Sequence, residues 1–525
     1  MSFFRKNSIT SKKTFVFLVL LFCLFFLKGV VSLDPDFGWH LATGQIILEK
    51  GIPRTDPFSF TMPSYPYIDH AWLSDTFIAF LYPKVKMFGL AAIALFLTVL
   101  SFLFVHSLET IEPKKALSGK SSFANLFPAS NRIFALFTSI SFLFSLTILL
   151  PFILIRTQII TWFFWSILIR VLLDKKLWGK YKVFLPAFFL LWANLHGGFF
   201  LGLVAVLIVI VVKSWNEKKI HFQDFVLITL SILATLINPY KGGLWKELFL
   251  TLTSKLLRTE ISEWLPIFLN PDLMVVFLLT LSLFFIFKYR KKYFPEEVVL
   301  YFFMLSQAIL SVKHIPLWVF LAMPLTTKGF RFLLLEAKKY KYGRKRFEKL
   351  YLWTWMFSLT IFILQTILLV TTIDNLSEKK FYPSRALTYL RENSFGGEMF
   401  SEYGWGGYLI WKYPEKKVFI DGRMAVWRWK APLEEESNVF ENYIKIIRGD
   451  INYEEIFKKY DIRLVLWPRP KRGSFSEILN QKLANFLAKF GIEKKEFDFL
   501  KKLEEDNWVK VYEDEVAVVF KNPSR

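Results

Sequence analysis

Long apolar stretches separated by short charged segments dominate the first 372 residues of the chain. The first stretch runs from about Thr14 to Val31. Ten more are centred near residues 97, 142, 165, 188, 206, 229, 280, 304, 323 and 361. Because a helix of about 20 apolar residues crosses roughly 30 Å of hydrocarbon, the pattern predicts a polytopic α-helical membrane protein with about eleven spanning helices.

The first apolar stretch is expected to stay in the mature protein as a helix. It follows a basic segment that contains Arg5, Lys6, Lys12 and Lys13. The stretch is too long for a signal-peptide core and lacks a small-residue cleavage pattern. The N-terminus is therefore expected on the cytoplasmic side of the cell's inner (plasma) membrane.

Alternation of the helices from this start separates the loops by charge. All dense basic clusters fall on the inner side: Lys114–Arg132, Lys175–Lys182, Lys213–Lys219, Lys288–Lys292 and Lys338–Lys349. Most of the unusual polar motifs fall on the outer side: Asp34–Lys86, Arg156–Gln158, His196–Gly198, Asn238–Pro271 and Lys313–Pro316. This separation agrees with the excess of lysine and arginine found in cytoplasmic loops.

The composition changes after about Thr372, where charged residues mix with short apolar runs. Strand-like runs at Lys417–Ile420, Leu464–Trp467 and Val516–Phe520 alternate with helical patterns such as Asn452–Tyr460. The chain therefore divides into a transmembrane domain at residues 1–372, with its first outer loop at 33–86, and a soluble α/β domain at 373–525 outside the cytoplasm.

The overall composition supports a membrane protein and excludes other classes. Of the residues, 54% are hydrophobic and 59 are phenylalanine, more than a soluble core of this length needs. The net charge of +23 lies mostly in short loops that orient a membrane protein, so nucleic acid is not an expected partner. The single cysteine, Cys23, permits neither a disulfide framework nor a cysteine metal site.

The first outer loop begins with Asp34-Pro35-Asp36, where the first helix leaves the membrane. If a helix starts after Pro35, Asp36 and His40 share one face and together can handle a proton. The same residues also suit a purely structural role, with Asp34 as helix cap and Asp36 at the positive helix end. His70, later in the loop, is a candidate substrate contact.

The acidic pair in the first outer loop, the many helices and the outer α/β domain together resemble the glycosyltransferase C-fold superfamily. This superfamily includes protein O-mannosyltransferases, aminoarabinose transferases and oligosaccharyltransferase catalytic subunits. The resemblance implies a donor sugar on a polyprenyl phosphate or pyrophosphate, and a first-loop aspartate that acts as general base or helps hold a metal. The Asp34-Pro35-Asp36 spacing differs from the acidic dipeptide of the O-mannosyltransferases, which leaves open which residue is the base and whether a divalent ion binds.

Cationic outer residues are candidates for the donor phosphate. Arg156 lies at a depth where an unpaired charge costs about 2.5 to 3.5 kcal/mol, so it should have an anionic partner. Lys313 and His314 interrupt two apolar runs and can add positive charge beside Arg156. The alternative for all three is contact with ordinary lipid headgroups.

Further candidates lie in other outer segments. Asn194, His196 and Glu263 are candidate substrate contacts, although Asn194 and His196 also suit a tight turn between two helices. In the C-terminal domain, Glu402, Asp421 and Arg423 occur beside glycines and aromatic residues. They suit a sugar acceptor, but Asp421 and Arg423 can equally pair with each other within the chain.

These features and the resemblance predict a glycosyltransferase that moves a sugar from a lipid-phosphate donor to a glycan, lipid or protein acceptor. Asp34 or Asp36 is the expected base. A transporter or flippase, with the polar groups lining a pathway, and a non-catalytic envelope assembly protein are the alternatives. No cofactor is assigned, and a divalent metal stays open.

Overall fold

The computed structural model describes residues 23–106, 108, 140–269, 272–337, 339–340, 342–428, 430–432, 435–470 and 497–523. The basic N-terminal residues, the start of the Thr14–Val31 stretch and the predicted inner loop Lys114–Arg132 lie outside these ranges. Contacts within the chain define two compact units. The first is Met1–Val31 with Ile68–Ile373, and the second is Ser32–Tyr67 with Asp374–Arg525.

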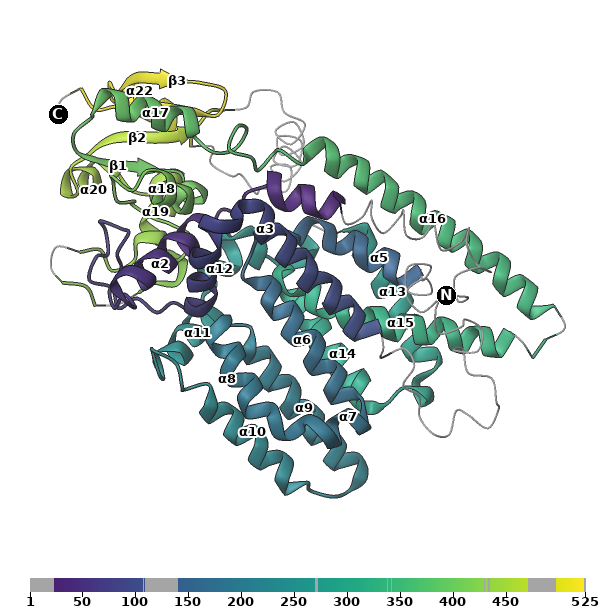
Figure 1. Ribbon diagram of the computed structural model, residues 1–525. Coiled ribbons are helices and arrows are strands. Elements are labelled where there is room, and N and C mark those ends of the chain that lie inside the picture. The colour runs from purple at the N-terminus through teal and green to yellow at the C-terminus, as the bar shows by residue number, and fades with distance from the viewer. Residues whose placement is uncertain are drawn as a thin grey trace. The chain divides into compact units, whose positions relative to one another are not determined.

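The first unit is built from helices, which Figure 1 colours from purple through teal to green. Residues 23–31 are helical. The other α-helices are α3 (Trp72–His106), α5 (Ile140–Leu149), α6 (Gln158–Leu173), α7 (Lys175–Tyr181), α8 (Leu185–Leu195), α9 (Phe199–Glu217), α10 (Phe222–Ala234), α11 (Gly243–Thr253), α12 (Lys255–Glu260), α13 (Leu273–Lys288), α14 (Pro295–Leu310), α15 (Ile315–Ala337) and α16 (Gly343–Thr372). Short 3-10 turns are η5 (Leu150–Phe152), η6 (Lys182–Phe184), η7 (Ser262–Trp264), η8 (Ile267–Leu269), η9 (Arg290–Lys292) and η10 (Val312–His314).

The ten predicted apolar centres from residue 97 to residue 361 all lie in these helices. In the described ranges, four helical segments are long and apolar enough to cross a membrane: Trp72–His106, Phe199–Glu217, Val312–Ala337 and Lys349–Thr372. Shorter apolar helices accompany them at Ile140–Phe152, Gln158–Leu173, Phe222–Ala234 and Leu273–Lys288. By length and composition, these are the helices of a multi-pass membrane protein.

Burial distinguishes central from peripheral helices in this unit. In the most apolar part of α15, 78% of the residues are buried, whereas the corresponding part of α16 is only 11% buried. A helix that is apolar all round belongs either in a core or against lipid. The helix α15 therefore forms the centre of the bundle, packed against α5, α13 and α14, and α16 presents most of its surface outward.

The second unit combines a small mixed sheet with short helices. Its helices are α2 (Phe37–Lys50), α17 (Ser384–Asn393), α18 (Gly406–Lys412), α19 (Val439–Arg448), α20 (Tyr453–Lys459) and α22 (Phe499–Glu505), with 3-10 turns η11 (Tyr403–Trp405) and η12 (Met424–Val426). The strands are β1 (Glu398–Ser401), β2 (Ile462–Pro468), β3 (Val509–Glu513) and β4 (Ala517–Lys521).

The sheet has the order β1-β2-β4-β3. Strands β1 and β2 are parallel and the other two pairs are antiparallel. The strand predictions at Leu464–Trp467 and Val516–Phe520 are confirmed by β2 and β4, and the helix predicted at Asn452–Tyr460 by α20.

The strand predicted at Lys417–Ile420 is wrong. Val418, in this segment, makes only an isolated bridge to Ser59. Its N–H donates to the Phe58 carbonyl (3.0 Å), and its own carbonyl accepts from the Phe60 N–H (3.2 Å). The apolar run is buried, as its composition indicates, but its hydrogen-bond partner is the first outer loop and not the sheet.

Residues 32–67 pack with the C-terminal part of the chain, although the sequence-based division assigned them to the transmembrane domain. The Leu33 N–H donates to the Leu376 carbonyl (3.0 Å), and the Tyr382 hydroxyl donates to the Leu33 carbonyl (2.9 Å). Helix α2 packs on α18 where a Cβ at Gly38 would overlap the Gly407 carbonyl. Two glycines thus let these backbones approach closely.

Candidate functional site

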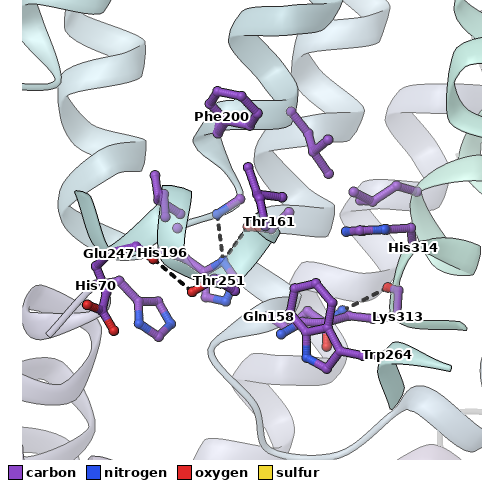
Figure 2. A pocket seen from close by; sticks show the side chains of 16 residues that line it. His70, Gln158, Thr161, His196, Phe200, Glu247, Thr251, Trp264, Lys313 and His314 are labelled. Carbon is purple, nitrogen blue, oxygen red and sulfur yellow. Dashed lines mark hydrogen bonds between the residues drawn. The ribbon is translucent and has the colours of Figure 1, made fainter. Parts of the chain in front are cut away.

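A pocket in the first unit is lined by side chains from widely separated parts of the chain (Figure 2). Its volume is about 810 Å³, including the space at its open side. Four residues that the sequence singled out line it: His70, His196, Lys313 and His314. They come from the segment before α3, the turn between α8 and α9, and η10. The fold of this unit thus gathers polar groups that are far apart in the sequence.

His196 is held in one orientation by its neighbours. Its Nδ1 accepts the Gly198 N–H (3.1 Å) and lies 2.8 Å from the Thr161 hydroxyl, as the dashed lines in Figure 2 show. Trp192 donates its indole N–H to the same hydroxyl (3.2 Å), which leaves the hydroxyl proton for His196. An Nδ1 that accepts hydrogen bonds places the proton of the neutral ring on Nε2.

Two imidazoles lie next to each other in the pocket wall. The ring centroids of His70 and His196 are 5.6 Å apart in an edge-to-face arrangement. A Cβ at Gly198 would overlap the Thr161 side chain, so this glycine allows the turn to approach α6. The sequence Asn194-Leu195-His196-Gly197-Gly198 is therefore both a tight turn and part of the pocket.

Positive charge and aromatic surface meet at another side of the pocket. The Lys313 ammonium lies 4.8 Å from the centroid of the Trp264 ring, and this ring packs edge-to-face against His314 at 6.0 Å. The Gln158 amide donates to the Lys313 carbonyl (3.2 Å) and fixes η10 beside the start of α6. The His314 Nδ1 is buried with no hydrogen-bond partner among the described residues.

Arg156 pairs with Glu263, so it has an anionic partner as the sequence led us to expect. The sequence had placed Glu263 with the substrate. Burial raises the pKa of the Glu263 carboxyl, but the charges of Arg156 and Lys313 and the hydrogen bond from Arg156 outweigh burial, so the net pKa is below its usual value. Two cations thus act on one carboxylate beside the pocket, although Arg156 does not itself line it.

Asn194, another predicted substrate contact, is engaged in structural hydrogen bonds. Its side-chain oxygen accepts from the Trp72 indole (2.9 Å). Its amide donates to the Leu190 carbonyl (2.8 Å) and the Ile237 carbonyl (3.0 Å). These bonds join α8 to the start of α3 and to the end of α10.

Two charged residues near this region were missed from the sequence. Glu247 is buried and lines the pocket from α11. Helical periodicity places it on one face of this helix with Leu244, Leu248 and Thr251, and this spacing is the signal that could have found it. Lys28 is buried in the helix at 23–31, and its Nζ donates to the carbonyls of Leu150 (2.6 Å) and Pro151. A lysine inside an apolar stretch is itself the signal, since such a charge needs a partner.

In the second unit, Asp34 and Asp36 have different environments. Asp34 is only 4% exposed, and its Oδ1 accepts the backbone N–H of Asp36 (2.9 Å). Asp36 is half-buried at the start of α2, and its Oδ1 accepts the Trp39 indole N–H (3.0 Å). The helix begins at Phe37, with Asp36 and not Asp34 at the position before it.

His40 lies one turn into α2, as the sequence indicated. Its backbone N–H donates to the Asp36 carbonyl (3.2 Å), which confirms the helical spacing of the two residues. The imidazole is buried and stacks on Trp39 with ring centroids 3.6 Å apart. The indole of Trp39 therefore contacts both Asp36 and His40.

Arg423 pairs with Asp421, one of the two arrangements that the sequence left open. The guanidinium donates two hydrogen bonds to Asp421 (2.8 and 2.7 Å) and also lies 2.8 Å from an oxygen of Asp56. Burial lowers the pKa of Arg423, but the charges of Asp421 and Asp56 outweigh burial and raise it well above its usual value. Phe58, Tyr67 and Trp427 place their rings around the guanidinium.

Glu402 lies close to this cluster in the second unit. Burial raises the pKa of its carboxyl, partly opposed by backbone hydrogen bonds from Gly404 and Trp405. Its Oε2 has no hydrogen-bond partner among the described residues. The charges of Glu402, Asp421 and Asp36 all act on the buried hydroxyl of Tyr403. The carboxylates of the first outer loop and of the C-terminal segment thus share one environment.

The described residues contain no group of three or more His, Cys, Asp or Glu side chains placed to hold a metal ion. The carboxylates of the second unit bind backbone N–H groups, indole and guanidinium instead.

Solved structures share the fold of this protein over most of the chain, and this similarity confirms the resemblance to the glycosyltransferase C-fold. One is the archaeal oligosaccharyltransferase AglB from Archaeoglobus fulgidus in complex with an inhibitory peptide and a dolichol-phosphate. Its TM-score is 0.55 and its sequence identity 12%, covering 87% of this chain and 70% of that one. Another is the oligosaccharyltransferase of the same organism, tethered to an acceptor peptide. Its TM-score is 0.51 and its sequence identity is 12%, and the match covers 86% of this chain and 69% of that one.

ArnT from Cupriavidus metallidurans, bound to undecaprenyl phosphate, has a TM-score of 0.46 at 10% identity, covering 97% of this chain and 98% of that one. No family model and no curated protein matches the sequence. At these identities the likeness defines the fold and not the activity.

Proposed function

We propose that this protein is an integral membrane glycosyltransferase that moves a sugar from a polyprenyl-phosphate donor to an acceptor on the non-cytoplasmic face. The shared fold supports this proposal, since the AglB structure holds a dolichol-phosphate and an inhibitory peptide. One observation in this chain carries it. The pocket of the first unit collects imidazoles and a lysine from separate outer segments.

Lys313 is the first candidate for the donor phosphate, because its ammonium lies in the pocket wall against Trp264. Lys313 and Arg156 both act on Glu263, so two positive charges meet one negative charge. Cationic side chains in and beside the pocket suit an anionic donor group and can stabilise a departing phosphate. His314, with its buried Nδ1, is a further polar contact for the donor.

Asp36 is the better candidate for the general base. The carboxylate of Asp34 is almost fully buried and already accepts a backbone N–H. Asp36 is half-buried and one of its oxygens is held by Trp39. A carboxylate with one oxygen fixed and its side chain partly accessible suits the transfer of a proton from an acceptor hydroxyl.

In the proposed reaction the acceptor hydroxyl oxygen attacks the anomeric carbon of the donor sugar, and its proton passes to the Asp36 carboxylate. A new carbon–oxygen bond forms on the face opposite the leaving group. The bond from the anomeric carbon to the phosphate oxygen breaks, and its electron pair stays on the polyprenyl phosphate. The anomeric configuration is therefore inverted.

The proposed topology has about eleven spanning helices, a cytoplasmic N-terminus and an extracytoplasmic C-terminal part. It supports lateral entry of the lipid-linked donor from the outer leaflet. His70 and His196 would then contact the sugar or the acceptor, because they line the same pocket as Lys313.

The test compares lipids from cells that express the wild type, Asp36→Asn, Asp34→Asn or Asp450→Asn, each extracted and analysed by mass spectrometry. Asp450 is exposed and its side chain makes no hydrogen bond or ion pair with the described residues, so it is a matched control for the charge change. We expect a polyprenyl-phosphate sugar to accumulate at least tenfold with Asp36→Asn and to stay at the wild-type level with Asp450→Asn.

Loss of a base that contributes about 10²–10⁴-fold to rate accounts for such accumulation. Accumulation with Asp34→Asn alone would reverse the assignment of the two aspartates. No sugar-bearing polyprenyl phosphate in any sample would overturn the transferase in favour of a transporter or an assembly protein.

A further inference from the structure

A second cavity of the first unit lies at the opposite end of α6 from the candidate site. The candidate pocket contacts the start of this helix, at Gln158 and Thr161. The second cavity contacts its last two turns, at Ile167 and Val171. Gln158 and Val171 are 13 residues apart, which is about 20 Å along a helix, so the two cavities lie toward opposite ends of α6.

The walls of this second cavity, which we call the α6–α8 groove, are almost entirely apolar. Ile167 and Val171 of α6, Phe188 of α8 and Phe184 of η6 are among the lining residues, and Arg170 is the one charged residue among them. The volume is about 980 Å³, including the space at its open side. Val183 and Phe184 are 58% and 62% exposed and extend the apolar surface past the groove. A hydrocarbon chain fits these walls better than any polar ligand.

Five cations occur from the last turn of α6, through α7, to the start of η6, in the segment that contributes Arg170, Leu177, Tyr181 and Phe184 to the groove. Three of the cations have acidic partners: Arg170 with Asp174 (2.6 Å), Lys175 with Glu217 (3.3 Å) and Lys182 with Asp224 (2.6 Å). The two others, Lys176 and Lys180, are exposed and have no acidic partner among the described residues. Lys176 precedes Leu177, which lines the groove, and the Lys180 ammonium lies 5.0 Å from the ring centroid of Tyr181, another lining residue. The groove therefore has two uncompensated cations at its rim.

The combination identifies the kind of ligand. A hydrocarbon chain gains little by leaving the bilayer for an apolar groove, because lipid tails are as apolar as the groove itself. Selective binding must therefore come from the headgroup. Lysines without acidic partners beside an apolar groove between helices are the arrangement that holds anionic lipid headgroups on the cytoplasmic side of membrane proteins.

We propose that the α6–α8 groove binds an anionic phospholipid of the cytoplasmic leaflet, with its phosphate at Lys176 and Lys180. One acyl chain lies between α6 and α8, and the other lies along Val183 and Phe184. This site does not depend on the glycosyltransferase proposal, since it shares no lining residue with the candidate pocket.

The test uses the full-length protein in detergent micelles, with phosphatidylglycerol and phosphatidylcholine supplied in equal amounts and native mass spectrometry as the readout. We expect one retained phosphatidylglycerol per chain and at least a fivefold preference over phosphatidylcholine. The double variant Lys176→Gln, Lys180→Gln should lose this preference. Val171→Trp, which fills the groove and keeps both lysines, should reduce retention of the lipid.

The matched control is Lys218→Gln, Lys219→Gln. These two exposed lysines directly follow α9, next to Glu217, the partner of Lys175. The control therefore removes the same charge at the same end of the bundle. The control should retain phosphatidylglycerol like the wild type. An equal loss in both double variants would show only general attraction to anionic lipid and would overturn the site. Retention of a polyprenyl phosphate in place of phosphatidylglycerol would overturn the assigned ligand.

Discussion

Arg423 is a buried cation whose charge is compensated by residues from two distant parts of the chain. Asp421 is its neighbour in sequence, whereas Asp56 belongs to the first outer loop. The side chains of Arg423 and of both aspartates are at most 4% exposed. Breaking a buried ion pair by removing one partner is strongly destabilising, because the remaining charge is left without compensation.

Replacing Arg423 by methionine should therefore destabilise the second unit by about 3–5 kcal/mol. The measurement is the melting temperature of the full-length protein in detergent, together with the rate of trypsin cleavage within residues 32–67. Arg423→Lys should have an intermediate effect, since an ammonium cannot reproduce the forked hydrogen bonds to Asp421.

Arg463→Met is the control for this variant. Arg463 pairs with Asp461 at the surface, where the two side chains are 38% and 52% exposed, and such pairs contribute about 0–1 kcal/mol. Equal sensitivity of the Arg423 and Arg463 variants would contradict a structural role for the buried cluster.

The cluster of Arg423, Asp421 and Asp56 shows which contacts of a residue can be predicted from the sequence. The pairing of Asp421 with Arg423 is predictable, because the two residues are close neighbours in the chain. The contact with Asp56 is not, because nothing local in either segment specifies the partner. Likewise, the sequence predicts that Arg156 needs an anion, but not that Glu263 supplies it.

At the scale of elements, the packing of α2 on α18 links the first outer loop to the C-terminal segment. Gly38 and Gly407 lie at this contact, and a Cβ on Gly407 would overlap the Pro35 carbonyl. Asp36 lies directly before α2, so this contact also positions the proposed base.

Gly38→Ala should separate the two helices, because the added Cβ meets a backbone carbonyl that cannot rotate away. Overpacking of this kind costs about 1–3 kcal/mol. We expect faster proteolysis within residues 32–67 and accumulation of the same sugar-lipid as with Asp36→Asn.

Gly396→Ala is the control, since Gly396 is exposed and a Cβ there has no neighbour within 4 Å. Unchanged proteolysis of Gly38→Ala would rule out a tight α2–α18 contact.

Helices were more predictable than strands or pairings. Each apolar centre from residue 97 to residue 361 lies in a helix, because hydrophobic length and periodicity are local properties. The Lys417–Ile420 segment has strand-like composition, but its backbone bonds to residues 58 and 60 and not to the sheet. Such a choice between partners is made by tertiary contacts, so composition alone did not reveal it.

At the scale of the whole molecule, the charge distribution predicts which side of the membrane each segment faces. The basic segments Lys175–Lys182 and Lys213–Lys219 belong to the predicted inner set, and the candidate site residues belong to the outer set. The pocket of the first unit brings together four residues of the predicted outer set: His70, His196, Lys313 and His314.

Single-cysteine labelling tests this orientation, because the chain has only one natural cysteine, Cys23. In a Cys23→Ser background we expect a membrane-impermeant maleimide to label Gly396→Cys in intact spheroplasts. Lys219→Cys should react only after the membrane is permeabilised. Both positions are exposed in the structure, so access is limited by the membrane alone. The reverse pattern of labelling would contradict the proposed orientation.

The grouping of residues 32–67 with 374–525 has a consequence for synthesis of the protein. A ribosome makes the first outer loop early, but the partners of residues 32–67 come later. Val418, Arg423 and the helix α18 that packs on α2 emerge only after every apolar helix has been made. Asp36 therefore reaches its final surroundings last. A nascent or truncated chain that lacks the C-terminal segment has the proposed base but not the scaffold that holds it.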